Sequence, residues 1–122
     1  MTVEWVFLCE NVLLREGVID TIVGIFRPQI AIQAPTFPTG FRCTFACALL
    51  TASNADIALA IEVWAGKDRL SVLPITLPGT PSGSVEAKVP LGWIVTEPST
   101  YTITIQANGI RLWTSDIRIV GS

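Results

Sequence analysis

Apolar residues recur at every second position along most of this chain, and this period constrains the fold more than any other feature. In "FRCTFACALL" (41–50) and "YTITIQA" (101–107), one series of apolar residues occupies alternate positions. Successive side chains of a β-strand point to opposite faces of a sheet, so a period of two is typical of strands. β-branched residues are abundant, and apolar residues at helical spacing are scarce. The sequence therefore predicts an all-β fold.

Segments of this kind are separated by clusters of Gly, Pro, Asn, Asp and Ser, which favour turns. The longest connection, residues 27–40, contains three prolines and is predicted to be a loop that carries the chain from one sheet to the other. Short strands between regular turns predict one domain over residues 1–122, an antiparallel β-sandwich of immunoglobulin-like or jelly-roll-like type. About eight strands are expected, over residues 3–10, 19–26, 41–50, 57–64, 70–76, 84–91, 101–107 and 110–120.

The last two of these strands form the clearest hairpin in the chain. Asn108-Gly109 is the residue pair that favours a two-residue type I′ turn, and such a turn sets the register of the strands beside it. Regular pairing from this turn joins Ile105 to Leu112 and places Trp113 on the opposite face. With this pairing, the isoleucines near the end of the strand would point to the face opposite that of Leu112. A β-bulge is therefore expected at the Ser-Asp step before them.

The first part of the chain carries a family resemblance. In "VEWVFLCENVLLREGVIDTIVGIFRPQI", the first strand ends in Leu-Cys-Glu and the second in Gly-Ile-Phe. Together with the late Pro98-x-x-Tyr101 step and the glycine of the last hairpin, these motifs resemble a bacterial domain family of unknown function. The likeness covers most of the chain, and its motifs are short. It implies a single β-sandwich domain and a cytoplasmic bacterial protein, but no activity and no site residue.

Charge and composition narrow the functional classes. Only 15% of the residues are charged, compared with about 25% in an average globular protein, and the formal net charge is −2. Lys and Arg are scattered singly, which disfavours binding to nucleic acid or to an anionic membrane surface. The start of the chain carries acidic residues where a signal peptide has a basic end, and no apolar run is long enough for a membrane span. We therefore expect a cytoplasmic protein.

The residue types for common catalysis are missing or poorly spaced. The chain has no histidine, the commonest general base and metal ligand. Cys43 and Cys47 would lie about 13 Å apart along one strand, too far for a disulfide or a close metal pair. With Cys9 they make an odd number of cysteines, which we interpret as buried, reduced thiols. The acidic residues occupy outward positions or strand ends. The sequence therefore predicts a protein that is not an enzyme and holds no metal or cofactor.

One predicted sheet surface is unexpectedly apolar. The outward positions of strands 41–50 and 57–64 should be polar if they face water, yet they include Ala46, Ala48, Leu50, Ala58, Ala60 and Trp64. A contiguous apolar surface of this kind usually marks an interaction site. These residues are the predicted contact face of a homo-oligomer, with a dimer favoured, unless the 27–40 loop covers them. The predicted function is a non-enzymatic structural or protein-interaction module that self-associates.

The tryptophans suggest an alternative. Trp5 and Trp93 follow the inward series of their strands and are predicted to be in the core. Trp64 and Trp113 fall opposite the main apolar series, so both are expected on outer faces. Exposed aromatic rings on a β-sandwich can stack on sugar rings. The alternative function is therefore a ligand- or glycan-binding module that uses Trp64 and Trp113.

Overall fold

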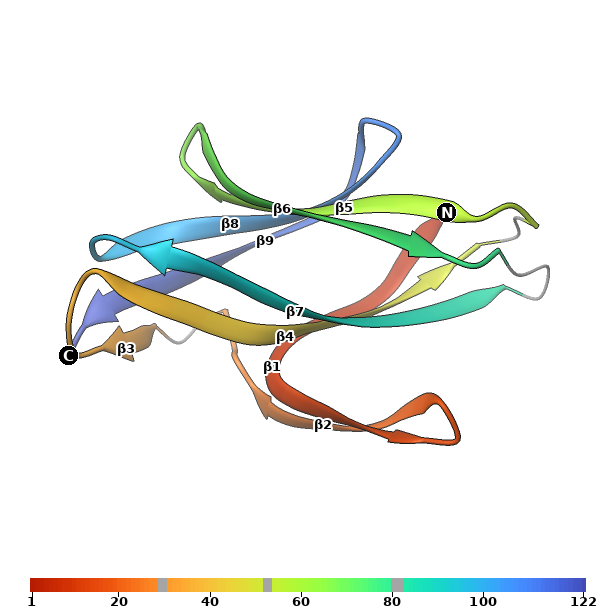
Figure 1. The fold of residues 1–122 in the computed structure, drawn as a ribbon, viewed down its shortest axis with the longest axis horizontal. Coiled ribbons are helices and arrows are strands. Elements are labelled where there is room, and N and C mark those ends of the chain that lie inside the picture. Colours follow the sequence, from red (N-terminus) through yellow and green to blue (C-terminus); the bar gives the residue numbers. More distant parts are fainter. Residues whose placement is uncertain (29–30, 52–53, 80–82) are drawn as a thin grey trace.

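The computed structural model describes residues 1–28, 31–51, 54–79 and 83–122. Regular structure in these residues consists of strands alone (Figure 1). In chain order they are β1 (Thr2–Arg15), β2 (Val18–Ile25), β3 (Ile32–Ala34), β4 (Thr39–Leu50), β5 (Ile57–Ala65), β6 (Asp68–Leu77), β7 (Ser84–Val95), β8 (Ser99–Ala107) and β9 (Ile110–Gly121). The described part of the chain contains no helix long and apolar enough to cross a membrane.

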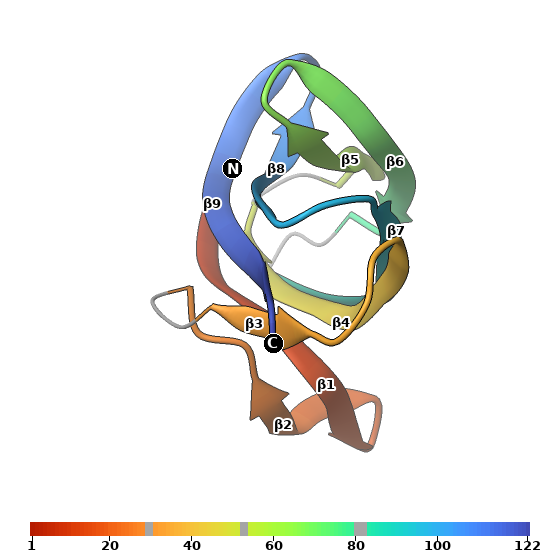
Figure 2. The ribbon, with the colours of Figure 1, turned by 90° about the vertical axis from the view of Figure 1, so that its left-hand side faces the viewer.

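The strands form two sheets that pack face to face. Sheet A has the order β2-β1-β4-β7, and sheet B has the order β3-β9-β8-β5-β6. Figure 2 shows the two layers seen from one end of the molecule, with the core between them. Every pairing is antiparallel except that of β3 with β9. The prediction of an all-β sandwich is confirmed, with nine described strands in place of about eight.

The core follows from the period-two pattern. One series of alternate residues on each central strand points between the sheets and is buried, including Phe45 and Leu49 of β4, Ile61 of β5 and Ile103 of β8. Cys43 and Cys47 belong to the same inward series of β4. Because both sheets contribute such a series, their side chains meet in one continuous apolar cluster.

Two segments differ from the prediction. The 27–40 connection is not only a loop, because its residues Ile32–Ala34 form β3 and pair with the end of β9 in sheet B. The chain therefore passes from β2 in sheet A to β3 in sheet B, and then back to β4 in sheet A. The first strand was predicted to end at residue 10, but β1 continues to Arg15 and pairs with β2. This extension creates a long hairpin that the alternation pattern did not reveal.

The β8–β9 hairpin contains its bulge at a different place from the prediction. Ala107 pairs with Ile110 as expected, but Ile105 pairs with Trp113 and not with Leu112. The extra residue near Leu112 reverses the alternation early in β9. Trp113 therefore points between the sheets, where its ring meets Phe45 edge-on at a centroid distance of 6.1 Å. A bulge close to the turn brings Trp113 and the later isoleucines of β9 onto the same inner face.

The β1–β2 hairpin folds over the outer face of sheet A. Val12 is buried and packs with Cys9 and Ala46, while Ile19 and Ile22 pack against this group from β2. The Ile19 amide donates a hydrogen bond to Oε1 of Glu86 on β7 at 3.3 Å, and the Thr44 hydroxyl donates to the carbonyl of Glu10 at 3.3 Å. The part of the outer side of sheet A around Ala46 is therefore covered by residues of the same chain, and the covering segment is this hairpin.

Candidate interaction surface and apolar pocket

The six residues predicted to form one contact face lie on two different sheets. Ala46, Ala48 and Leu50 are on β4 in sheet A, whereas Ala58, Ala60 and Trp64 are on β5 in sheet B. Consecutive strands were expected to be neighbours, but the connection between β4 and β5 crosses from one layer of the sandwich to the other. The outer faces of the two layers point in opposite directions, so these six residues do not form a common surface.

Two of the three sheet A residues of this predicted face are not accessible. Ala46 is fully buried beneath the hairpin, and Ala48 is 2% exposed between its cross-strand neighbours Trp5 and Glu86. Leu50, at the end of β4, is 46% exposed. The chain itself covers the alanines, which removes the physical reason for expecting a homo-oligomer through this face.

The sheet B part is partly open to solvent and also contains a buried polar group. Glu62, predicted to face solvent, is only 4% exposed. One of its carboxylate oxygens accepts a hydrogen bond from Nη1 of Arg69 at 3.0 Å, and the other accepts one from the buried hydroxyl of Thr104 at 3.5 Å. A nearly buried carboxylate needs such partners to offset the loss of hydration. Beside this group, Ala58 is exposed and Ala60 is half-buried.

The tryptophans do not form a stacking platform. Trp64 is half-buried on the outer face of sheet B, and Trp113 points to the inner face. The two rings therefore lie on opposite faces of one sheet. Trp93 is in the core as predicted, with ring centroids 4.9 Å from Phe41 and 5.6 Å from Tyr101. Trp5 is partly buried on the outer face of sheet A, under the hairpin, and not between the sheets.

The β1–β2 hairpin presents apolar side chains to solvent. Five large apolar residues of the hairpin are between 39% and 57% exposed: Leu13, Leu14, Val18, Val23 and Ile25. By the strand register, Leu13, Val18, Val23 and Ile25 share the side opposite Val12 and Ile22. We call these four residues the hairpin surface. Figure 1 shows the hairpin as an arm below the two sheets.

Sequence reasoning missed the hairpin surface because it assigned one apolar face to each strand. Both sides of the hairpin are apolar, one packed on sheet A and the other in solvent. The adjacent Leu13 and Leu14, which were placed outside any predicted strand, are the signal that could have indicated it. Two neighbouring apolar residues on one strand must point to opposite faces.

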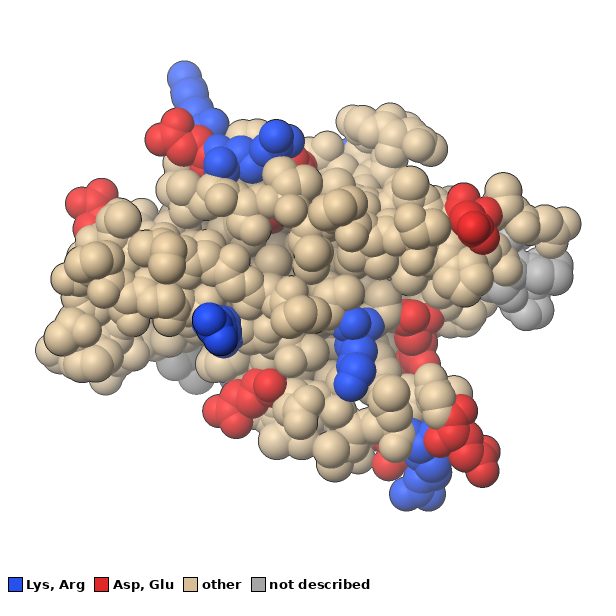
Figure 3. Space-filling view, in the orientation of Figure 1, with Lys and Arg blue, Asp and Glu red and all other residues tan. Residues whose placement is uncertain are grey.

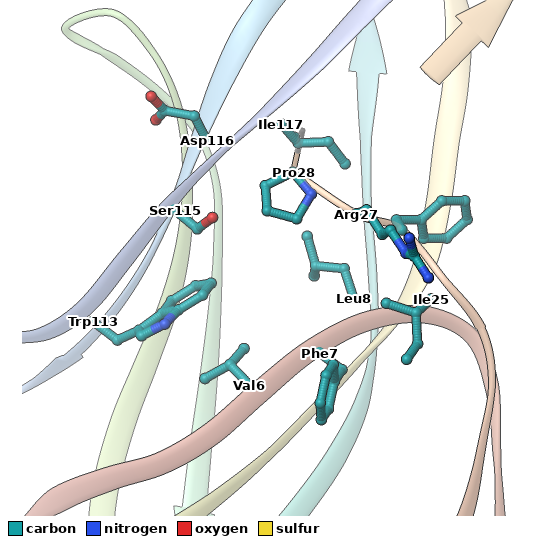
Figure 4. A pocket seen from close by; sticks show the side chains of 11 residues that line it. Val6, Phe7, Leu8, Ile25, Arg27, Pro28, Trp113, Ser115, Asp116 and Ile117 are labelled. Carbon is teal, nitrogen blue, oxygen red and sulfur yellow. The ribbon is translucent and has the colours of Figure 1, made fainter. Parts of the chain in front are cut away.

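An apolar pocket of about 320 Å³ lies at the base of the hairpin, between β1 of sheet A and β9 of sheet B. No ladder joins these two strands in the described part of the chain, so the sandwich is open along this side. Figure 4 shows side chains from β1, the end of β2, the segment after it and β9 around the pocket, among them Val6, Leu8, Ile25, Trp113, Ser115 and Ile117. Arg27 lies across the pocket from Trp113.

The titratable groups show no cluster that indicates a metal centre. Within residues 1–28, 31–51, 54–79 and 83–122, no group of three His, Cys, Asp or Glu side chains is placed to hold a metal ion. Burial raises the pKa of Cys43 to about 12 and that of Cys47 to about 11, so both thiols are poor nucleophiles near neutral pH. On the face seen in Figure 3, charged side chains of both signs are scattered, and some of them lie beside side chains of opposite charge.

Comparisons with known proteins show no family for this chain. No protein-family model and no curated protein matches the chain. This agrees with the resemblance to a family of unknown function, and the structure is all-β, as that resemblance implies. One similar solved structure is the Pseudomonas fluorescens alkylpurine DNA glycosylase AlkC bound to DNA containing an abasic site analog, at 11% identity and a TM-score of 0.41. The match covers 66% of this chain and 26% of the glycosylase chain.

Two predictions made from composition need correction. The prediction that the chain is not an enzyme is not upheld, because the similar structure is a glycosylase. The predicted partners, a homo-oligomer with no nucleic acid, are not upheld either, because the glycosylase is bound to DNA and the chain's own hairpin buries Ala46 and Ala48. A likeness at this TM-score shows neither glycosylase activity nor DNA binding in this chain.

Proposed function

We propose that this chain is a protein-interaction module and that it binds its partner through the hairpin surface. The observation that carries the proposal is the exposure of Leu13, Val18, Val23 and Ile25 on one side of a single hairpin. Scattered apolar residues are normal on a protein surface, but a group of them on one element usually marks a contact site. The other side of the same hairpin is held on sheet A, so the surface is presented on a fixed support.

The attachment of the hairpin supports this proposal. Val12 and its neighbours pack on Ala46, and the Ile19 amide is bonded to Glu86. An apolar surface that is already ordered loses less conformational entropy on binding than a mobile loop does. A partner with an apolar surface of its own would bury these four side chains and leave the charged tip of the hairpin, where Arg15 and Asp20 form an ion pair at 3.5 Å, at the rim.

We also propose a reducing compartment, the cytoplasm, as the site of action. All three cysteines are buried and free, and Cys9 lies on the opposite face of sheet A from Cys43 and Cys47. Such thiols need no oxidising environment, since the fold is held without a disulfide. The glycan-binding alternative gains no support, because Trp64 and Trp113 lie on opposite faces of sheet B.

The test compares charge substitutions on and off the hairpin surface. Affinity purification from cells of the source organism, followed by titration of the purified partner, would use wild type, Leu13→Glu/Val23→Glu and Ile94→Glu. Ile94 is 63% exposed on β7 and is the matched control. We expect the double variant to raise the dissociation constant at least about tenfold and the control to leave it unchanged. Equal capture and equal affinity for all three proteins would contradict the proposal.

A further inference from the structure

The pocket between β1 and β9 has the composition of a small-molecule site. Its volume of about 320 Å³ falls at the lower end of the range of known ligand pockets. Val6, Leu8 and Ile117 form an apolar floor, and the half-buried indole of Trp113 forms one wall. An engineered apolar cavity of about 150 Å³ accepts one benzene ring, so this pocket has room for an apolar body of about two rings.

The polar groups at the pocket are few and differ in charge. Ser115 is cross-strand from Ile103 on the inner face of β9, and its hydroxyl points among the lining side chains in Figure 4. Arg27 is exposed at the opposite side, and no ion pair joins it to another described residue. Its guanidinium is therefore free to bind an acidic group.

The one acidic residue that lines the pocket is not placed to repel an anion bound there. Asp116 contributes to the lining, but its Oδ1 accepts a hydrogen bond from the hydroxyl of Thr102 at 2.8 Å. Thr102 is its cross-strand neighbour on the outer face of sheet B. The carboxylate accordingly points away from the other lining side chains in Figure 4. The other charged residue that lines the pocket is Arg27.

We infer that this pocket binds a small aromatic carboxylate, with its rings against Trp113 and Leu8 and its acidic group beside Arg27. The indole face offers stacking to a flat body, and Ser115 offers a hydroxyl for a second polar contact. The open side of the sandwich provides the entrance, because β9 from Ile110 to Arg118 pairs only with β8 among the described strands. This site adjoins the partner contact proposed above, because Ile25 of the hairpin surface also lines the pocket, whereas Leu13, Val18 and Val23 do not.

The test uses three probes of equal size and different charge: 2-naphthoate, 2-naphthylmethanol and 2-naphthylmethylamine. Isothermal titration calorimetry at neutral pH should give the tightest binding for the anion and the weakest for the cation. Arg27→Gln should weaken the binding of 2-naphthoate about tenfold and leave the affinity for the neutral probe unchanged. Arg111→Gln, an exposed arginine on β9 that does not line the pocket, is the matched control.

Two further variants test whether the probes bind in this pocket. Ser115→Phe should fill the pocket and abolish binding of both the anion and the neutral probe. Leu13→Glu/Val23→Glu should leave probe binding intact, because neither residue lines the pocket, so this variant distinguishes the pocket from the partner contact. Absence of saturable binding by wild type, equal binding of the anion and the cation, an unchanged affinity in Arg27→Gln, or loss of binding in the hairpin variant would each overturn the inference.

Discussion

Two pairs of alanines, Ala46 and Ala48 on β4 and Ala58 and Ala60 on β5, occupy equivalent outward positions in the two sheets but have different surroundings. The β4 pair is buried, because the β1–β2 hairpin and the neighbouring side chains cover it. The β5 pair lies on an open face, where Ala58 is exposed. The same sequence pattern therefore corresponds to an internal contact in one sheet and to a solvent surface in the other.

The difference shows what small residues do on an outer sheet face. At Ala46 the missing side-chain volume lets a second layer of backbone approach, and Val12 and Ile22 occupy the space. On sheet B no described strand covers the face, and the polar group formed by Glu62, Arg69 and Thr104 occupies part of it. Small apolar residues permit a close contact but do not specify which segment makes it.

The largest expected effect comes from charging the covered alanine. In Ala48→Glu, a carboxylate would be placed in a buried site next to Glu86, its cross-strand neighbour. A buried charge without a partner typically costs about 3–5 kcal/mol of stability. Ala58→Glu, on the exposed face, should change stability by less than about 0.5 kcal/mol. Chemical denaturation of both variants checks this, and equal stabilities would show that the hairpin does not cover β4.

The inner face of β4 gives a pH-dependent effect. Burial raises the pKa of Cys43 to about 12 and of Cys47 to about 11, whereas both titrate near 9 when unfolded. The unfolded state then loses protons first, so stability is full below pH 9 and falls as pH rises from there toward the folded pKa values. The expected loss is about 1 kcal/mol per pH unit for each thiol.

Urea unfolding curves between pH 7 and pH 11 measure this loss. The control is Cys43→Ala/Cys47→Ala, whose stability should depend less steeply on pH above 9. An identical pH dependence in the two proteins would show that these thiols are not buried in the way described. Their side of β4 would then resemble the open face of β5.

On sheet B, the corresponding test removes the cation of the polar group. Arg69→Ala leaves the nearly buried Glu62 with the Thr104 hydroxyl alone. The Arg69 side chain is 52% exposed, so solvent screens its contribution, and we expect a loss of about 1–2 kcal/mol. Adding Glu62→Gln should restore part of this loss. If Arg69→Ala has no effect on the unfolding midpoint, the polar group does not stabilise that face.

An effect of similar size is expected at the base of the covering hairpin. Gly24 has a φ of +67°, and a Cβ there would meet the Glu10 side chain at 2.6 Å. Glu10 can move, so the cost of Gly24→Ala is mainly that of the left-handed backbone, about 1–2 kcal/mol. Gly40→Ala has no such φ and no atom within 4 Å of the added Cβ, so it serves as the control. Faster amide exchange in the hairpin should accompany only the first substitution.

The alternation of residues such as Phe45, Leu49 and Ile103 was enough to predict the strands and the inward-facing core, because strand geometry ties period two to burial. The site was predicted less well for two physical reasons. The bulge near Leu112 depends on tertiary packing and reverses the orientation of Trp113, which local alternation cannot show. The cover over Ala46 is a contact between segments far apart in the sequence, and alternation carries no information about which segment forms it.

The central claim is that the chain itself covers the outer face of β4, and cysteine labelling tests it most directly. Ala48→Cys and Ala58→Cys are small changes that keep the fold, and the native thiols are buried. A fluorescent maleimide should label position 48 at least about 100-fold more slowly than position 58, because labelling needs local opening. The contrast should be the same at micromolar and nanomolar protein concentrations. Rapid labelling of position 48 on dilution would contradict the account, because it would show that another molecule provides the cover.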